Sequence, residues 1–172
     1  MIDIYDVLFP KRGTPESYEK SLAYDGSYES THPELFQPDR IVFLGGVLQS
    51  RRVGDAAYHE ALVHPTLFAH PNPKRVAIIG GGEGATLREV LKHNTIEKVV
   101  MIEIDEMMVN VSRRFLPEWS DCSNLVGRSD NCFDDARVEL YFEDAFKWFE
   151  DRFLSADESP EDVFDVIIMD AL

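Results

Sequence analysis

The chain has 172 residues, 44% hydrophobic and 28% charged, a composition typical of a globular protein large enough to form its own core. The formal net charge of −15 argues against nucleic-acid binding through a basic face and favours cationic ligands, although acidity also serves solubility alone. No apolar run approaches the roughly 20 residues of a membrane span and no basic-then-apolar leader opens the chain, so we expect a cytoplasmic protein without a membrane partner.

Residues 1–54 are predicted to form a small N-terminal β unit. Prolines recur at four places up to position 38, so we expect one short irregular hairpin over residues 1–37. The runs 39–44 and 47–53 are typical of strands, and Gly45-Gly46 between them is a strong signal for a two-residue hairpin turn. A helix is expected to begin at Asp55, a candidate N-cap, and to end near position 68.

A glycine-rich turn comes next and is the most informative segment. The apolar run 76–79 predicts a strand, residues 80–84 (GGGEG) a sharp turn, and residues 86–91 a helix. Glycines let the backbone approach a ligand closely, and the helix start directs unpaired N–H groups at it, which predicts a nucleotide site. The spacing also satisfies the dinucleotide fingerprint, so the glycines alone do not identify the ligand.

Glu83 within this turn narrows the choice of ligand. A helix start that receives phosphate is normally free of acid, so Glu83 indicates a cationic ligand group. The alternative, that Glu83 only stabilises the helix N-terminus, stays open at this point.

Three further strand-like runs also end in acids. The run 98–105 ends in acids, and Glu103 within it lies about 20 residues beyond the turn, where nucleotide-binding α/β folds place a ribose-hydroxyl acceptor. Asp144 follows the run 137–142, and Asp170 follows the run 163–169. Because the carboxyl ends of parallel strands share one edge of a sheet, we expect these acids to converge with Glu83.

The remaining cysteine, histidine and phenylalanine positions predict no further site. Cys122 and Cys132 lie in a polar stretch typical of a surface insertion, and without a matching histidine pair they are interpreted as free thiols. His32, His64, His70 and His93 show no ligand spacing, so we expect surface or helix-end roles and no metal. Phenylalanines recur at intervals of three and four in residues 146–153, which predicts a helix packed on the sheet.

Seven segments together resemble the spermidine synthase family of polyamine aminopropyltransferases, in the family's order and spacing. These segments are 46–50, 55–65, 76–89, 103–105, 113–117, 143–145 and 164–170, so the resemblance covers about residues 40–170. It implies an α/β fold with a Rossmann-like parallel sheet of the S-adenosylmethionine-methyltransferase type over residues 55–172. The β unit of residues 1–54 precedes this catalytic domain, lies beside the active site in the family and often helps to form a homodimer.

The resemblance also implies the substrates and the residues that bind them. The co-substrate would be decarboxylated S-adenosylmethionine, with no prosthetic group. The acceptor amine would be putrescine, giving spermidine, or spermidine, giving thermospermine or spermine, with methylthioadenosine released. Gln49 and Glu83 would hold the aminopropyl end, Glu103 the ribose hydroxyls and Asp144 the adenine amino group. Asp170 would accept a proton from the attacking amine. The other implied site residues are Tyr58, which would orient the amine, His59 near it, and Gly80, Gly81, Gly82 and Ala145.

The chemistry needs such carboxylates independently of the resemblance. An alkyl amine of pKa about 10 is mostly protonated at neutral pH, so a carboxylate must hold it and take up its proton before it attacks carbon. Ordinary S-adenosylmethionine carries a carboxylate that Glu83 would repel. Methyltransferases of similar fold have an acid two positions before the first glycine, where this chain has Ile78. An S-adenosylmethionine-dependent methyltransferase and an inactive nucleoside- or polyamine-binding fragment are the alternatives.

The C-terminal end raises a further expectation. The sequence stops at Leu172, whereas the family continues with an Asp-Pro pair and more strands and helices that close the amine pocket. Residues 163–169 are apolar on both faces, as an interior strand would be. We therefore expect a fragment of a longer protein that is inactive, or nearly so, by itself.

Overall fold

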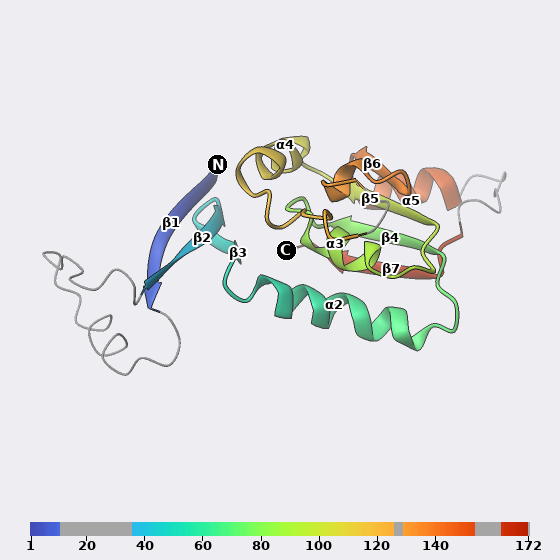
Figure 1. Ribbon diagram of the computed structural model, residues 1–172. Helices are drawn as coiled ribbons and strands as arrows, with labels where there is room; N and C mark the ends of the chain where they lie inside the picture. Colours follow the sequence, from blue (N-terminus) through green and yellow to red (C-terminus); the bar gives the residue numbers. More distant parts are fainter. Residues whose placement is uncertain (11–35, 126–128, 154–162, 172) are drawn as a thin grey trace, which may run out of the picture. The chain divides into compact units, whose positions relative to one another are not determined.

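The computed structural model describes residues 1–10, 36–125, 129–153 and 163–171 (Figure 1). The chain divides into two compact units, residues 1–54 and residues 55–172. Among the described residues, none of the helices combines the length and apolar character needed to cross a bilayer.

The N-terminal unit is a three-stranded antiparallel sheet in the order β1-β2-β3. Its strands are β1 (Ile2–Pro10), β2 (Phe36–Leu44) and β3 (Val47–Arg51). The predicted β2–β3 hairpin is present, and its turn needs glycine because Gly45 and Gly46 have φ values of 56° and 83°.

The expectation of one short irregular hairpin over residues 1–37 is wrong for the described part of that segment. β1 is a regular strand that pairs with β2 along its whole length, from Ile2 opposite Leu44 to Pro10 opposite Phe36. Pro10 is compatible with this arrangement because it is the last residue of β1, an edge strand. Residues 11–35 lie outside the described part of the chain.

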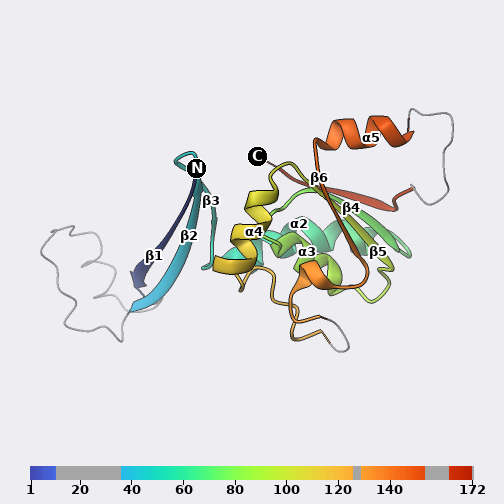
Figure 2. The same cartoon turned by 90° about the horizontal axis from the view of Figure 1, so that it is seen from above.

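The second unit is built on a four-stranded parallel sheet in the order β6-β5-β4-β7 (Figure 2). The strands are β4 (Arg75–Gly80), β5 (Lys98–Glu103), β6 (Val138–Phe142) and β7 (Val166–Asp170). The helices are α2 (Asp55–Ala69), α3 (Ala85–Leu91), α4 (Glu106–Phe115) and α5 (Ala145–Phe153), with a short η2 turn (Cys132–Asp134). This arrangement confirms the predicted Rossmann-like, methyltransferase-type sheet.

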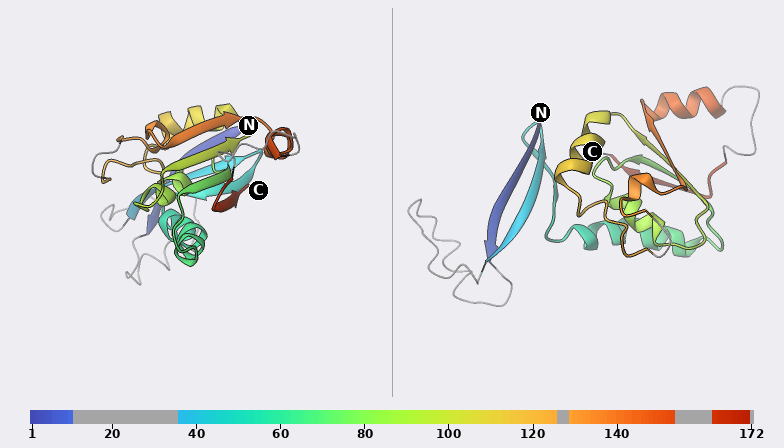
Figure 3. Two further views of the ribbon diagram at one scale, coloured as in Figure 1. Left: turned by 90° about the vertical axis from the view of Figure 1, so that its right-hand side faces the viewer. Right: turned by 45° about the horizontal axis from the view of Figure 1, so that its top comes forward.

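Helices cover both faces of this sheet, with α2 and α3 on one face and α5 on the other (Figure 3). On the first face, side chains of β4 and β5 such as Ile78 and Met101 pack against Leu67 of α2 and Leu87 of α3. On the second face, Trp148 of α5 is 2% exposed against the other sides of the strands. The two central strands are therefore buried on both sides, which accounts for their nearly continuous apolar sequences.

The prediction of free thiols is wrong, because Cys122 and Cys132 form a disulfide. An isolated antiparallel bridge joins Asp121 and Asn131, and the Cys132 N–H donates to the Ser120 carbonyl at 2.8 Å. This pairing brings the two cysteine Cα atoms to 5.1 Å, within the range of a disulfide. Both cysteines belong to the buried core, so the segment is not a simple surface insertion.

Candidate functional site

The glycine-rich turn joins β4 to α3 and lies against the end of β7. Gly80, Gly81 and Gly84 have φ values of 80°, 77° and 89°, a region that side chains other than glycine rarely adopt. The Gly81 N–H donates to the Asp170 carbonyl at 3.0 Å, and a Cβ atom at position 80 would lie 2.4 Å from that oxygen. Glycine therefore permits the turn to approach β7 closely enough to present Glu83 beside Asp170.

Gly82 has a separate role at the end of β5. A Cβ atom there would lie 2.8 Å from Oε2 of Glu103 and 2.7 Å from Cγ of Met108. The Glu103 carboxylate is buried beside the turn and accepts a hydrogen bond from the Asp105 N–H at 2.9 Å. Burial raises the pKa of Glu103, and nearby Glu83 raises it further, while hydrogen bonds from backbone N–H groups oppose the increase.

Asp170 ends β7 and points its carboxylate at the same turn. The Thr86 hydroxyl, in the first turn of α3, donates to its Oδ2 at 2.6 Å. Burial raises the pKa of Asp170 and the negative charge of Glu83 adds to the increase, while the hydrogen bond from Thr86 and the positive charge of His59 oppose it. A carboxylate whose pKa is raised in this way is a better proton acceptor than an exposed one.

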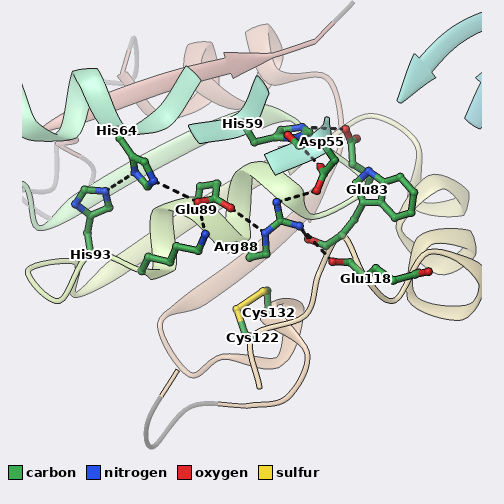
Figure 4. Close-up of polar contacts among 12 residues, drawn as sticks. Asp55, His59, His64, Glu83, Arg88, Glu89, His93, Glu118, Cys122 and Cys132 are labelled. Atoms are coloured by element: carbon green, nitrogen blue, oxygen red, sulfur yellow. Dashed lines mark hydrogen bonds and ion pairs between the residues drawn. A yellow bond between two sulfur atoms is a disulfide. The ribbon is translucent and has the colours of Figure 1, made fainter. Parts of the chain in front are cut away.

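His59 lies beside the acids Asp55 and Glu83 (Figure 4). Its side chain is 2% exposed, and Nδ1 lies 2.8 Å from Oδ1 and 2.9 Å from the backbone carbonyl of Asp55. Its Nε2 lies 3.4 Å from Oε1 of Glu83. Burial disfavours the charged ring, but the hydrogen bonds to Asp55 and Glu83 outweigh that effect and raise the pKa of His59 to about 10.

Tyr58 contacts His59 edge to face, with ring centroids 4.9 Å apart, and its own ring is 58% exposed. Burial of part of the side chain and the negative charges of Asp170 and Glu83 raise the pKa of its hydroxyl. The phenol therefore stays protonated and can donate a hydrogen bond near Asp170 and Glu83.

Asp144 and Ala145 lie farther from this group of acids along the sheet edge. Asp144 and Ala145 are at the end of β6, two strands away from β4, or about 10 Å along the sheet edge. Asp144 is exposed and accepts a hydrogen bond from the Lys147 N–H at 3.0 Å in the first turn of α5. Gln49 lies in β3 of the N-terminal unit, where its Nε2 donates to the Val47 carbonyl at 3.4 Å, and its assignment to the site stays a prediction.

Sequence reasoning missed an ion-pair network next to the carboxylates. Arg88, in α3, donates to Oδ2 of Asp55 at 3.0 Å and to Oε1 of Glu89 at 2.9 Å. It also donates to the carbonyls of Glu118 and Trp119 at 3.2 and 3.0 Å. Asp55 is predicted only as a candidate N-cap and Arg88 only as a residue of a helix. The one indication of a buried ion pair is that Arg88, a charged residue, lies in a helix whose described side chains are all buried.

His64 and His93 also belong to this network, and are not simply at helix ends. Nδ1 of His64 lies 2.9 Å from Nε2 of His93, and Nε2 of His64 lies 3.3 Å from Oε2 of Glu89. Glu89 is fully buried. Its Oε2 also lies 2.6 Å from Nζ of Lys92, and its Oε1 lies 2.9 Å from Nε of Arg88.

Two groups of side chains have the spacing of metal ligands among the described residues, with atoms within 4.8 Å of one another. They are His59, Glu83 and Asp170, and Glu60, His64 and Glu89. In the first group both ring nitrogens of His59 already lie near carboxylates, Nδ1 at 2.8 Å from Asp55 and Nε2 at 3.4 Å from Glu83. In the second group Lys92 and Arg88 contact the buried Glu89 carboxylate.

Comparison with known proteins links this geometry to one family. The model of the spermine/spermidine synthase domain matches residues 55–172. Polyamine aminopropyltransferase 1 of Hyperthermus butylicus is 48% identical over 131 residues, which are 76% of this chain and 40% of that protein. Polyamine aminopropyltransferase of Pyrobaculum calidifontis is 42% identical over 166 residues, which are 94% of this chain and 53% of that protein.

Solved structures give the same result. The crystal structure of spermidine synthase from Thermotoga maritima has a TM-score of 0.64 and 36% identity, over 77% of this chain and 40% of that chain. A spermidine synthase in complex with the transition-state analogue AdoDATO has a TM-score of 0.64 and 35% identity, over 77% of this chain and 39% of that chain. The chain thus spans about half the length, or less, of the proteins that it matches.

Proposed function

This chain belongs to the spermine/spermidine synthase family, and on that premise we propose that it binds decarboxylated S-adenosylmethionine for aminopropyl transfer to an amine. Residues 55–172 are the nucleoside-binding catalytic domain in this proposal, and residues 1–54 are the N-terminal β unit. The names of the relatives and the AdoDATO complex of a structural neighbour support this assignment.

The observation that carries the proposal is the group of three carboxylates at the glycine-rich turn. Burial raises the pKa of both Glu103 and Asp170, and the nearby negative charge of Glu83 adds to the increase, so the three acids form a site suited to a cationic ligand. Decarboxylated S-adenosylmethionine supplies a sulfonium and an ammonium. An anionic dinucleotide or phosphate would instead face repulsion from the same groups.

Each group then has a role in binding the donor. Glu83 binds the aminopropyl ammonium and Glu103 accepts hydrogen bonds from the ribose hydroxyls, while Gly80, Gly81 and Gly82 let the nucleoside approach the backbone. Asp144, about 10 Å along the edge, accepts from the adenine amino group, with Ala145 beside it. Gln49 assists at the aminopropyl end.

Transfer proceeds by displacement at the carbon next to the sulfonium. Asp170 takes a proton from the acceptor ammonium, and Tyr58 orients the neutral amine with its hydroxyl. The nitrogen lone pair forms the new C–N bond while the C–S bonding pair moves to sulfur, which leaves as neutral methylthioadenosine. Positioning of the two reactants supplies much of the acceleration, and the acceptor is putrescine or spermidine.

Calorimetric titration of the chain with the decarboxylated donor, with S-adenosylmethionine and with methylthioadenosine tests the proposal. We expect the decarboxylated donor to bind at least about tenfold more tightly than S-adenosylmethionine, because the extra carboxylate of the latter meets Glu83 and Asp170. Glu83→Gln should reduce this preference, whereas Glu106→Gln, an exposed acid in the first turn of α4, should preserve it. A wild-type preference for S-adenosylmethionine would replace the proposal with methyl transfer.

We also propose that the whole protein is a cytoplasmic homodimer that associates through its N-terminal unit. Tyr5, Val47 and Leu48 of that unit are 54%, 61% and 50% exposed, and apolar surface of this kind favours association. Light scattering coupled to gel filtration would test the assembly, and cell fractionation the location. A monomeric mass at micromolar concentration would contradict the dimer.

A further inference from the structure

A continuous series of ionic contacts runs from Arg88 of α3, through Asp55 and His59 of α2, to Glu83 of the glycine-rich turn. Arg88 is anchored on Glu89 and on two backbone carbonyls of residues 118 and 119, with its side chain only 11% exposed. Its remaining contact is with Asp55, at 3.0 Å. Four acceptors at fixed positions hold the planar guanidinium in one orientation, so the Asp55 carboxylate beside it is also fixed.

Asp55 divides its two oxygens between two cations. Oδ2 accepts a hydrogen bond from Arg88, and Oδ1 lies 2.8 Å from Nδ1 of His59, one helical turn further along α2 (Figure 4). The opposite ring nitrogen of His59 lies 3.4 Å from Glu83. His59 thus lies between two carboxylates, with one ring nitrogen 2.8 Å from Asp55 and the other 3.4 Å from Glu83, an environment that favours a doubly protonated ring.

We propose that Asp55, itself fixed by Arg88, is a positioning residue that keeps His59 an imidazolium between Glu83 and Asp170, so that both of these carboxylates are ionised when the donor binds. The inference rests on the proposed function for the identity of the donor. The contact geometry of Arg88, Asp55 and His59 supports it independently of any ligand.

The physical need for this cation follows from the crowding of the acids. Atoms of His59, Glu83 and Asp170 lie within 4.8 Å of one another in a largely buried site. Two carboxylates at such a separation cannot both ionise easily, and one normally retains a proton. A protonated Asp170 could not accept the proton of the attacking amine. One imidazolium reduces the charge of these three side chains from minus two to minus one and so favours ionisation of both carboxylates.

The charged and titratable groups that face His59 come from every element packed around it. They are Asp55 and Tyr58 of α2, Glu83 of the β4–α3 turn and Asp170 of β7, with Arg88 of α3 behind Asp55. His59 lowers the pKa of Asp170 against the opposing effects of burial and Glu83. Loss of the positive charge on His59 therefore leaves Asp170 with a still higher pKa.

The test is an NMR titration of the histidine ring nitrogens in the full chain, with His59→Gln used to assign the signal of His59. Asp55→Asn keeps the size of the side chain and removes its charge, and should lower the pKa of His59 by roughly 1–3 units. Glu60→Gln is the matched control, since Glu60 is an exposed acid of the same helix, and it should leave the titration of His59 where it is. Asp55→Glu keeps a carboxylate at this position and should retain part of the increase in the pKa of His59.

A second readout follows binding of the decarboxylated donor by calorimetry as a function of pH. Affinity should fall on the acid side in both proteins as carboxylates take up protons, and Asp55→Asn should depart from the wild-type profile at alkaline pH, where its His59 loses its proton at a lower pH than in the wild type. A merely structural role for Asp55 would weaken binding at every pH without moving the profile.

The outcomes separate the inference from the proposed function. If the wild-type chain binds no decarboxylated donor, the proposed function fails, while the NMR titration still decides the state of His59. If Asp55→Asn fails to fold, the wild-type spectrum decides alone: at about pH 8 both ring nitrogens of His59 must be protonated, well above the ordinary titration of histidine. A neutral His59 at that pH, or an unchanged titration in folded Asp55→Asn, overturns the inference.

Discussion

Raising the pH should destabilise this protein through one buried histidine. The pKa of His59 is about 10 in the folded chain and 6.5 in its ordinary state, so the folded chain binds one more proton than the unfolded chain between these values. The stabilisation is complete below pH 6.5 and is lost as the pH rises through about 10. A pKa difference of about 3.5, at about 1.36 kcal/mol per pKa unit, corresponds to an upper value of about 5 kcal/mol.

Urea unfolding of the wild type and of His59→Gln between pH 6 and pH 10 measures this contribution. Groups distant from His59 titrate alike in both proteins, so the difference between their free energies of unfolding reports on His59 and the carboxylates that it contacts. We expect the wild type to lose about 3 to 5 kcal/mol more than the variant across this range. His70→Gln, which changes the histidine that directly follows α2, should retain the wild-type slope. Equal slopes for wild type and His59→Gln would refute the imidazolium and the reasoning built on it.

Three further changes probe the turn, the disulfide and the end of β7. Gly80→Ala should destabilise the fold by roughly 1–3 kcal/mol in urea unfolding, because φ is 80° and the new Cβ would lie 2.4 Å from the Asp170 carbonyl; an unchanged midpoint would show that the turn is not strained. Replacement of both Cys122 and Cys132 by Ala should cost roughly 3 kcal/mol, measured the same way, and a reducing agent should then have no further effect on the variant. Thr86→Val removes the 2.6 Å hydrogen bond to Asp170 and should raise the pKa of that carboxyl, so that donor binding measured by calorimetry weakens at a higher pH than in the wild type; an identical pH profile would count against a role for this hydroxyl.

The parts of the fold that sequence predicts are those with local periodicity. β4 to β7 are short apolar runs bounded by turn residues or acids, and α3 follows a turn that only glycine can form. The expected convergence of acids follows from parallel topology alone, and Glu83, Glu103 and Asp170 do meet. Asp144 stands apart because β5 separates its strand, β6, from β4, whereas β7 pairs directly with β4, and the sequence of a single strand does not reveal this order.

The features that sequence did not predict depend on contacts between distant residues. β1 pairs with residues 26 or more positions later in the chain, so no local sequence pattern predicts this pairing. The disulfide depends on an antiparallel bridge between Asp121 and Asn131, whereas spacing alone is compatible with free thiols. Asp55 is predicted only as a candidate N-cap and Arg88 only as a residue of a predicted helix, because their pairing requires α2 to lie against α3.

The most direct test of the central claim is a crystal structure of the chain with bound decarboxylated S-adenosylmethionine. Our account predicts the aminopropyl nitrogen within about 3 Å of the Glu83 carboxylate, the ribose hydroxyls at Glu103 and the sulfonium beside Asp170. A nucleoside bound away from the glycine-rich turn, or one whose positive charges face none of these three carboxylates, would contradict it.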